Sequence, residues 1–248
     1  MFKRTFSKLL IYGGVLSGLS VYASPWNGAY VSLLGGTSAF QGQVNTTMSL
    51  SHRSDLLNQT RIHRELPMAG VALGYGRLFH CHWYLGTEIG FEQFLSGNGF
   101  SSSSQTHIGG MVPFDYSTTN TLRPRQSFFW SALMGYQWRQ YLSYIRLGYV
   151  NTQMSYQNDL LMVGGSSTTI HVSNQRYLSL NGIRVGLGVK AAVSKHVSVG
   201  AEVNYTQYAN RRVAFDASTD AFNVATQTSA ALTGLKTLNT MVSLSYHF

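Results

Sequence analysis

The feature that most constrains this chain is a strict alternation of apolar and polar residues in which the polar positions include charges. Within residues 183–190, Ile, Val, Leu and Val alternate with Arg, Gly, Gly and Lys. Alternate residues of a β-strand point to opposite faces, so each such segment has one apolar and one polar face. A charge turned toward the dry core of a soluble β-sandwich costs several kcal/mol unless it is paired. The alternation therefore favours a membrane barrel, with apolar residues toward lipid and polar residues inside.

Eight segments show this alternation, and long and short connections alternate between them. The expected strands are about 26–37, 66–79, 83–96, 125–138, 141–155, 175–192 and 196–210, with a last one after residue 235. The long connections, which we expect to be external loops, are about 38–64, 97–122, 156–174 and 211–235. This spacing is typical of an antiparallel meander across a bilayer. The sequence predicts an all-β, eight-stranded antiparallel up-and-down transmembrane β-barrel.

The polar faces also predict what fills the barrel. The chain has 25 glycines and only 11% charged residues, and the glycines share the polar face with long side chains. Small residues make room for large ones inside a narrow barrel, and eight strands enclose only enough space for side chains. The predicted lumen charge network consists of Glu88, Glu92, Arg146, Arg184, Lys190 and Glu202. Both signs are present, so we expect a filled lumen, with a small narrow channel as the alternative.

The first residues have the form of a secretory signal peptide. Lys3, Arg4 and Lys8 precede an apolar run over residues 9–22, and Ala23 is a suitable cleavage position. The run is shorter than the roughly 20 residues of a spanning helix. We expect residues 1–23 to be removed, leaving an exported barrel of residues 24–248. Cys81 is the only cysteine, so no intrachain disulfide is expected.

The last residues, "LNTMVSLSYHF", alternate up to an aromatic end, whereas the termini of soluble domains usually fray into polar residues. With the signal peptide, the early "WNGAYVSLLGG" and the closing "MVSLSYHF", the whole mature chain resembles the small eight-stranded outer-membrane barrels of the OmpA and opacity-protein kind. The resemblance implies an outer-membrane location and a barrel without a peptidoglycan-binding domain. It also implies that Tyr246 and Phe248 belong to an assembly signal read by the outer-membrane assembly machinery.

Arginines gather where the expected loops meet the strands. They are Arg61, Arg64, Arg123, Arg125, Arg176, Arg211 and Arg212. In a Gram-negative outer membrane this level faces lipopolysaccharide phosphates, which the planar guanidinium binds well. The sequence therefore suggests a phosphate-binding collar, and ordinary solvated loop charge is the alternative. Nucleic acid is not an expected partner, because the cations are spread around a rim and the chain is exported.

The quartet "HVSN" raises an enzymatic alternative. It is similar to the His-x-Ser-Asn motif of the outer-membrane lipid A deacylases, which are also eight-stranded barrels. The similarity implies His171 as base, Ser173 as nucleophile and Asn174 as an oxyanion contributor. However, the next acidic residue is Glu202, on another expected strand, and the quartet precedes the sixth strand instead of lying on the second-last. We expect no enzyme.

No cofactor or metal site is expected either. His80, Cys81 and His82 are metal-ligand types, but three adjacent residues cannot close a four-ligand site alone. The aspartates Asp115, Asp159, Asp216 and Asp220 are isolated in expected loops, without a close acidic pair for peptidase chemistry. The sequence predicts a structural and surface-interaction protein with an adhesin-like role, in which the Ser-, Thr- and Asn-rich loops contact host or other surface ligands.

Overall fold

The computed structural model describes residues 26–50, 53–79, 82–95, 100–108, 114–164, 169–219 and 224–248. The expected signal peptide, with its cleavage position, lies outside these residues, as do His80 and Cys81. The strands are β1 Gly28–Leu50, β2 Arg53–Leu78, β3 Trp83–Phe94, β4 Phe100–Ile108, β5 Phe114–Trp138, β6 Tyr141–Gly164, β7 Thr169–Ala192, β8 Val197–Tyr208, β9 Arg211–Thr219 and β10 Val224–His247. Among the described residues, no helix is both long enough and apolar enough to cross a membrane.

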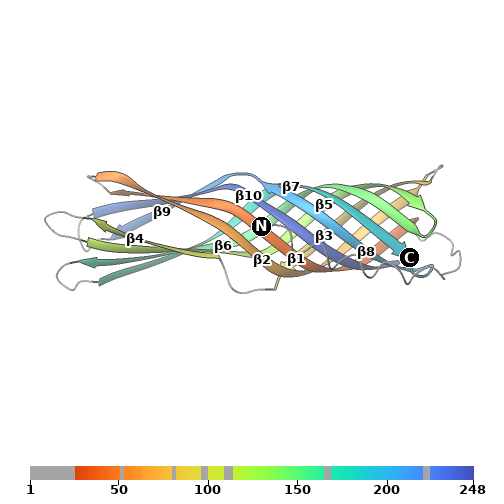
Figure 1. Ribbon diagram of the computed structural model, residues 1–248, viewed down its shortest axis with the longest axis horizontal. Coiled ribbons are helices and arrows are strands. Elements are labelled where there is room, and N and C mark those ends of the chain that lie inside the picture. The colour runs from red at the N-terminus through yellow and green to blue at the C-terminus, as the bar shows by residue number, and fades with distance from the viewer. Residues whose placement is uncertain are drawn as a thin grey trace, which may run out of the picture.

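Eight of these strands form a closed antiparallel ring. Its order is β1, β2, β3, β5, β6, β7, β8 and β10, and pairing of β10 with β1 closes it. The other two strands continue the ring outward: β4 pairs with the first part of β5 beyond the end of β3, and β9 pairs with the first part of β10 beyond the end of β8. Figure 1 shows both at the end of the tilted barrel away from the C-terminus. The predicted eight-stranded up-and-down barrel is confirmed.

The expected loop boundaries differ from the structure, because much of each long connection is strand. β1 and β2 remain paired as far as Leu50 and Arg53, and β6 and β7 as far as Val163 and Thr169. The four extended regions, here called the hairpin extensions, are β1–β2 over 38–66, β4–β5 over 100–122, β6–β7 over 156–176 and β9–β10 over 211–232. Backbone pairing can continue past the membrane because water tolerates polar outward side chains, and those side chains made the segments read as loops.

The outer face of the barrel is an apolar belt. Along β10, Leu238, Val242 and Leu244 are exposed, whereas Asn239 and Ser245 are buried inside. The other strands show the same division, with exposed side chains such as Leu73, Leu85, Ile89, Trp130, Met134, Leu147, Val185, Leu187 and Val203. An apolar surface that surrounds a closed barrel fits the hydrocarbon region of a bilayer.

Glycines inside the barrel make room for aromatic rings. A Cβ added to Gly90 would lie 2.4 Å from the ring of Phe129, and one added to Gly188 would lie 2.4 Å from the ring of Tyr144. Tyr30 occupies the space beside Gly74 in the same way. These are distances that real side chains do not show, so each glycine is needed for its neighbouring ring to fill the lumen.

Candidate functional site

The barrel interior is stacked in layers, with charged residues between two apolar clusters. Near the short turns, the cluster consists of Trp26, Tyr84, Leu133, Leu142, Tyr144 and Ala192. Toward the hairpin extensions, a larger cluster includes Phe40, Val44, Leu66, Phe94, Leu122, Met154, Leu180 and Leu232. The six residues of the predicted charge network lie between these clusters, and each is less than 8% exposed.

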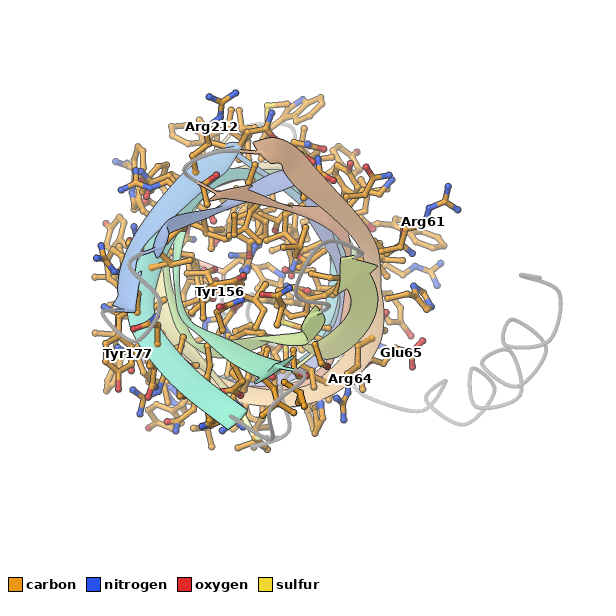
Figure 2. All side chains as sticks on the ribbon, turned by 90° about the vertical axis from the view of Figure 1, so that its left-hand side faces the viewer. Arg61, Arg64, Glu65, Tyr156, Tyr177 and Arg212 are labelled. Atoms are coloured by element: carbon orange, nitrogen blue, oxygen red, sulfur yellow. The ribbon has the colours of Figure 1, made fainter. Side chains whose placement is uncertain are left out.

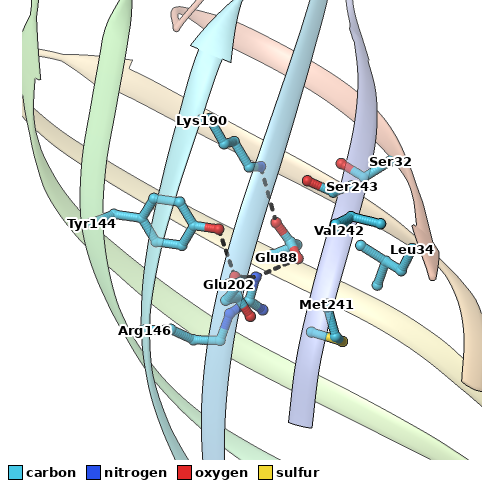
Figure 3. A pocket seen from close by; sticks show the side chains of 10 residues that line it. All are labelled: Ser32, Leu34, Glu88, Tyr144, Arg146, Lys190, Glu202, Met241, Val242 and Ser243. Atoms are coloured by element: carbon cyan, nitrogen blue, oxygen red, sulfur yellow. Dashed lines mark hydrogen bonds and ion pairs between the residues drawn. The ribbon is translucent and has the colours of Figure 1, made fainter. Parts of the chain in front are cut away.

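Arg146 is the centre of one part of the network. Its Nη2 donates to Glu88 Oε1 and to Glu202 Oε2, both at 2.9 Å, and Lys190 Nζ lies 3.7 Å from Glu88 Oε2. Two tyrosine hydroxyls donate further hydrogen bonds to the carboxylates: Tyr30 donates to Glu88 at 2.9 Å, and Tyr144 donates to Glu202 at 2.5 Å. Figure 3 shows most of these groups converging from different strands. Paired and hydrogen-bonded in this way, buried charges become tolerable.

Arg184 and Glu92 form the second part. The guanidinium Nη1 and Nη2 donate to the two carboxylate oxygens at 2.6 and 2.8 Å, a bidentate pair. The ring of Phe129 lies between the two parts, with its centroid 5.1 Å from the Arg184 guanidinium and 5.4 Å from that of Arg146. Three carboxylates therefore balance three cations, and an aromatic ring links the two groups through cation–π contacts.

Little space remains beside these charges. The cavity lined by Ser32, Leu34, Glu88, Tyr144, Arg146, Lys190, Glu202, Met241, Val242 and Ser243 has a volume of about 10 Å³, which is the room that one water molecule needs. The sequence reasoning missed Tyr30, Phe129 and Tyr144 as partners of the charges. Their positions on the inward face were visible in the alternation, but which charge each one meets depends on the closed ring.

The structure divides the seven predicted collar arginines between two faces of the barrel. Register places Arg64, Arg176 and Arg211 opposite Phe40, Tyr156 and Leu232, which are buried inside. Since directly paired residues share a face, these three arginines are on the inward face at the open end of the barrel. Arg61 and Arg212 point outward, away from Tyr156 in the interior (Figure 2). Neighbours such as Arg211 and Arg212 cannot both face outward on a strand.

Two of the arginines converge on an outer groove of about 400 Å³. Arg123 and Arg125 of β5 line it together with Gln175 and Tyr177 of β7, and Ser155 of β6 lies between them. The Arg125 guanidinium is 5.5 Å from the centroid of the Tyr177 ring. Arg125 is the extra residue of a β-bulge, because Pro124 pairs with Met154 and Gln126 with Gln153. The partners from β6 and β7 were not identifiable from the sequence, since strand register decides them.

The "HVSN" residues lie on the outer part of β7. His171 and Ser173 are exposed, and Asn174 follows on the opposite face. Register places Asp159 of β6 opposite Ser173, a carboxylate neighbour that the sequence did not indicate. Gln157 Nε2 donates to both Asp159 oxygens at 3.1 Å and to Ser173 Oγ at 3.5 Å. Among the described residues, no hydrogen bond joins His171 to Ser173.

The remaining predicted positions lie near the short turns. Phe248 is 75% exposed, its ring is 5.3 Å from that of Tyr246, and its backbone N–H donates to Ala29 at 3.1 Å. His82 is exposed, with its ring 6.0 Å from Tyr136. In the described parts of the chain, no group of three or more His, Cys, Asp or Glu side chains is arranged to hold a metal ion.

A closed ring of eight strands, an apolar belt and a packed polar interior together define a small transmembrane β-barrel. No protein-family model matches the chain, and no curated protein matches it significantly. Among solved structures, it is similar to the outer membrane protein OprG from Pseudomonas aeruginosa, with 12% identity over 91% of this chain and 99% of the other, and a TM-score of 0.49.

Two further solved structures are similar to this chain. The attachment invasion locus protein Ail of Yersinia pestis is 10% identical over 90% of this chain and 99% of its own, with a TM-score of 0.35. The outer membrane protease OmpT from Escherichia coli is 9% identical over 94% of this chain and 99% of its own, with a TM-score of 0.40.

Proposed function

We propose that the protein is an integral outer-membrane barrel with a filled lumen, and that the hairpin extensions act in surface interactions in an adhesin-like role. The main supporting observation is the division of the molecule into two parts. Inside the belt, every predicted lumen charge has an oppositely charged partner. Beyond the belt, the strands continue as hairpins, and many of the outward side chains described there are exposed.

The hairpin extensions suit binding because they are ordered by an apolar interior. Phe40 is 0% exposed, and Val44 and Ile62 of the same hairpin are buried with it. Their outward neighbours present mixed chemistry, with Arg61, His63 and Glu65 exposed on β2. On β6, Leu161 and Val163 are 38% and 40% exposed. A rigid scaffold that displays polar, charged and apolar side chains is the arrangement that recognition surfaces commonly use.

The experiment compares the intact protein with barrels whose hairpins are shortened in register. In one variant Asn-Gly replaces residues 46–58, and in the other it replaces residues 160–172. The new turns join Asn45 to Gln59 and Asp159 to Ser173, which are paired residues in the intact protein. Bacteria that display each barrel are tested for adherence to host cells, and heat modifiability in gels verifies folding. We expect the shortened barrels to fold and to lose adherence. Equal adherence by folded, shortened barrels would contradict the proposal.

We also infer that the protein is not a lipid A deacylase. Asp159 is near Ser173, but its carboxylate already accepts from Gln157, and Asn174 is on the opposite face from Ser173. Changing Ser173→Ala or His171→Ala should therefore leave lipid A acylation unchanged. Mass spectrometry of lipid A from cells with wild type, each variant or an empty vector measures this. Loss of one acyl chain with wild type alone would establish the enzyme.

A further inference from the structure

A row of amide side chains on five neighbouring strands borders the apolar belt on the side of the hairpin extensions. The outward positions one step beyond the apolar belt residues Phe91, Phe128, Tyr149, Ile183 and Tyr205 are Gln93 on β3, Gln126 on β5, Asn151 on β6, Asn181 on β7 and Gln207 on β8. Several are hydrogen-bonded across strands: Gln126 donates to Gln153 at 2.8 Å, and Asn151 donates to Ser179 at 2.7 Å and Asn181 at 2.6 Å. We take this row as the level at which lipid tails give way to headgroups.

The groove, which spans β3, β5, β6 and β7, begins at this row with Gln93 and extends beyond it. Tyr177 is four residues from Asn181 along β7, which is about 13 Å of an extended strand. Arg123 and Arg125 occupy the matching positions beyond Gln126. The groove therefore lies at the height of the headgroups, where the outer leaflet of a Gram-negative membrane carries phosphorylated sugars.

The chemistry of the groove fits such a headgroup. Arg123 and Arg125 are exposed and supply two planar guanidinium groups, which suit phosphate. Tyr177, 68% exposed, presents an apolar ring on which a sugar can pack, and the glutamine side chains supply donors and acceptors for sugar hydroxyls. The groove lining contains no acidic residue, so nothing in it repels an anion.

We propose that this groove is a specific binding site for the phosphorylated disaccharide headgroup of lipopolysaccharide, with Arg123 and Arg125 on phosphate and Tyr177 against a sugar ring. The proposal rests on the outer-membrane location proposed above. It assigns phosphate binding to one sector of the barrel instead of a uniform collar, because Arg61 and Arg212 face outward at other places on the rim and do not line this groove (Figure 2).

The test uses the full-length protein in nanodiscs and measures the dissociation constant for bisphosphorylated lipid A by native mass spectrometry across a salt series. The double variant Arg123→Gln with Arg125→Gln is compared with Arg61→Gln with Arg212→Gln, which removes the same charge elsewhere. Loss of two charge-assisted contacts should weaken binding in the groove variant by at least about tenfold and flatten its salt dependence. The control pair should bind within about twofold of wild type.

Dephosphorylated lipid A supplies the second arm. Wild type should bind it as weakly as the groove variant binds the bisphosphorylated form. Equal losses in the two double variants, or equal binding of both lipids by wild type, would overturn the site. Heat modifiability and outer-membrane fractionation verify that every variant folds and reaches the outer membrane. The lipid-binding result is independent of the adherence assay, because a barrel that adheres to nothing can still bind lipid.

Discussion

At the scale of single residues, the interior depends on buried ion pairs in which each charge is tolerated only because its partner is present. Arg184 and Glu92 lie on β7 and β3, 92 positions apart in sequence, and both are almost completely buried. Either charge alone inside the barrel would be strongly unfavourable. The pair therefore specifies how β3 and β7 face one another across the lumen.

Arg184→Met should destabilise the barrel by about 3–5 kcal/mol, because it leaves the Glu92 carboxylate buried without its cation. Urea unfolding in detergent micelles, followed by tryptophan fluorescence, measures the change. The double change Arg184→Met with Glu92→Leu removes both charges and should recover most of the lost free energy. A double variant no more stable than the single one would show that packing, and not charge, is what Arg184 provides.

Glycine–aromatic pairs give a second prediction at this scale. Gly90→Ala brings a Cβ within 2.4 Å of the Phe129 ring and should cost about 1–3 kcal/mol of unfolding free energy through overpacking. Gly35→Ala is the matched control, because no atom lies within 4 Å of its added Cβ. The same unfolding measurement applies to both variants. Similar effects at the two positions would mean that backbone conformation, and not the ring, accounts for the loss.

At the scale of elements, β10 closes the barrel by pairing with β1 on one side and β8 on the other. Its outward face ends at Tyr246 and Phe248. The Phe248 side chain is largely exposed, so little of its area is buried within the folded protein. An aromatic residue that contributes little to internal packing is better explained by lipid contact or by recognition during assembly.

Phe248→Ser should slow the appearance of heat-modifiable barrel in pulse-labelled cells while changing the unfolding free energy of the assembled barrel by less than about 1 kcal/mol. The reason is that recognition during assembly needs the aromatic side chain, whereas the finished fold hardly does. Leu244→Ser removes another exposed apolar residue of β10 and is the control. Wild-type assembly kinetics in the Phe248 variant would argue against an assembly signal.

At the scale of the whole molecule, the barrel combines a closed interior with a long outward extension. Apolar clusters lie on both sides of the charged layer, and the cavity beside the charges is the size of one water molecule. In the proposed function, the hairpins and the outer surface serve interaction, while the packed interior stabilises the barrel.

Wild-type protein in planar bilayers should therefore show no large, stable conductance, because ions would have to displace paired charges and packed rings. Current recordings over a range of voltages measure this, with detergent alone as the control. Reproducible single-channel steps that scale with protein concentration would establish the narrow channel instead.

The sequence alone determined the eight-stranded barrel, its outward face and the identity of the six lumen charges, because alternation in a strand assigns every residue to one of two faces. The outward positions of Leu238, Val242 and Leu244 followed from this rule, as did the glycines beside bulky side chains. This information is local, because the alternation within a single strand is enough to assign its residues to the two faces.

Only the tertiary structure decided which residues meet. The pairing of Arg184 with Glu92, the position of Asp159 opposite Ser173 and the convergence of Arg125 with Tyr177 all depend on strand register and ring closure. The hairpin extensions were also missed, since polar outward residues in water weaken the alternation while backbone pairing continues. A period of two tells which face a side chain takes, whereas its neighbour across the sheet or the lumen is set by hydrogen bonds between segments distant in the chain.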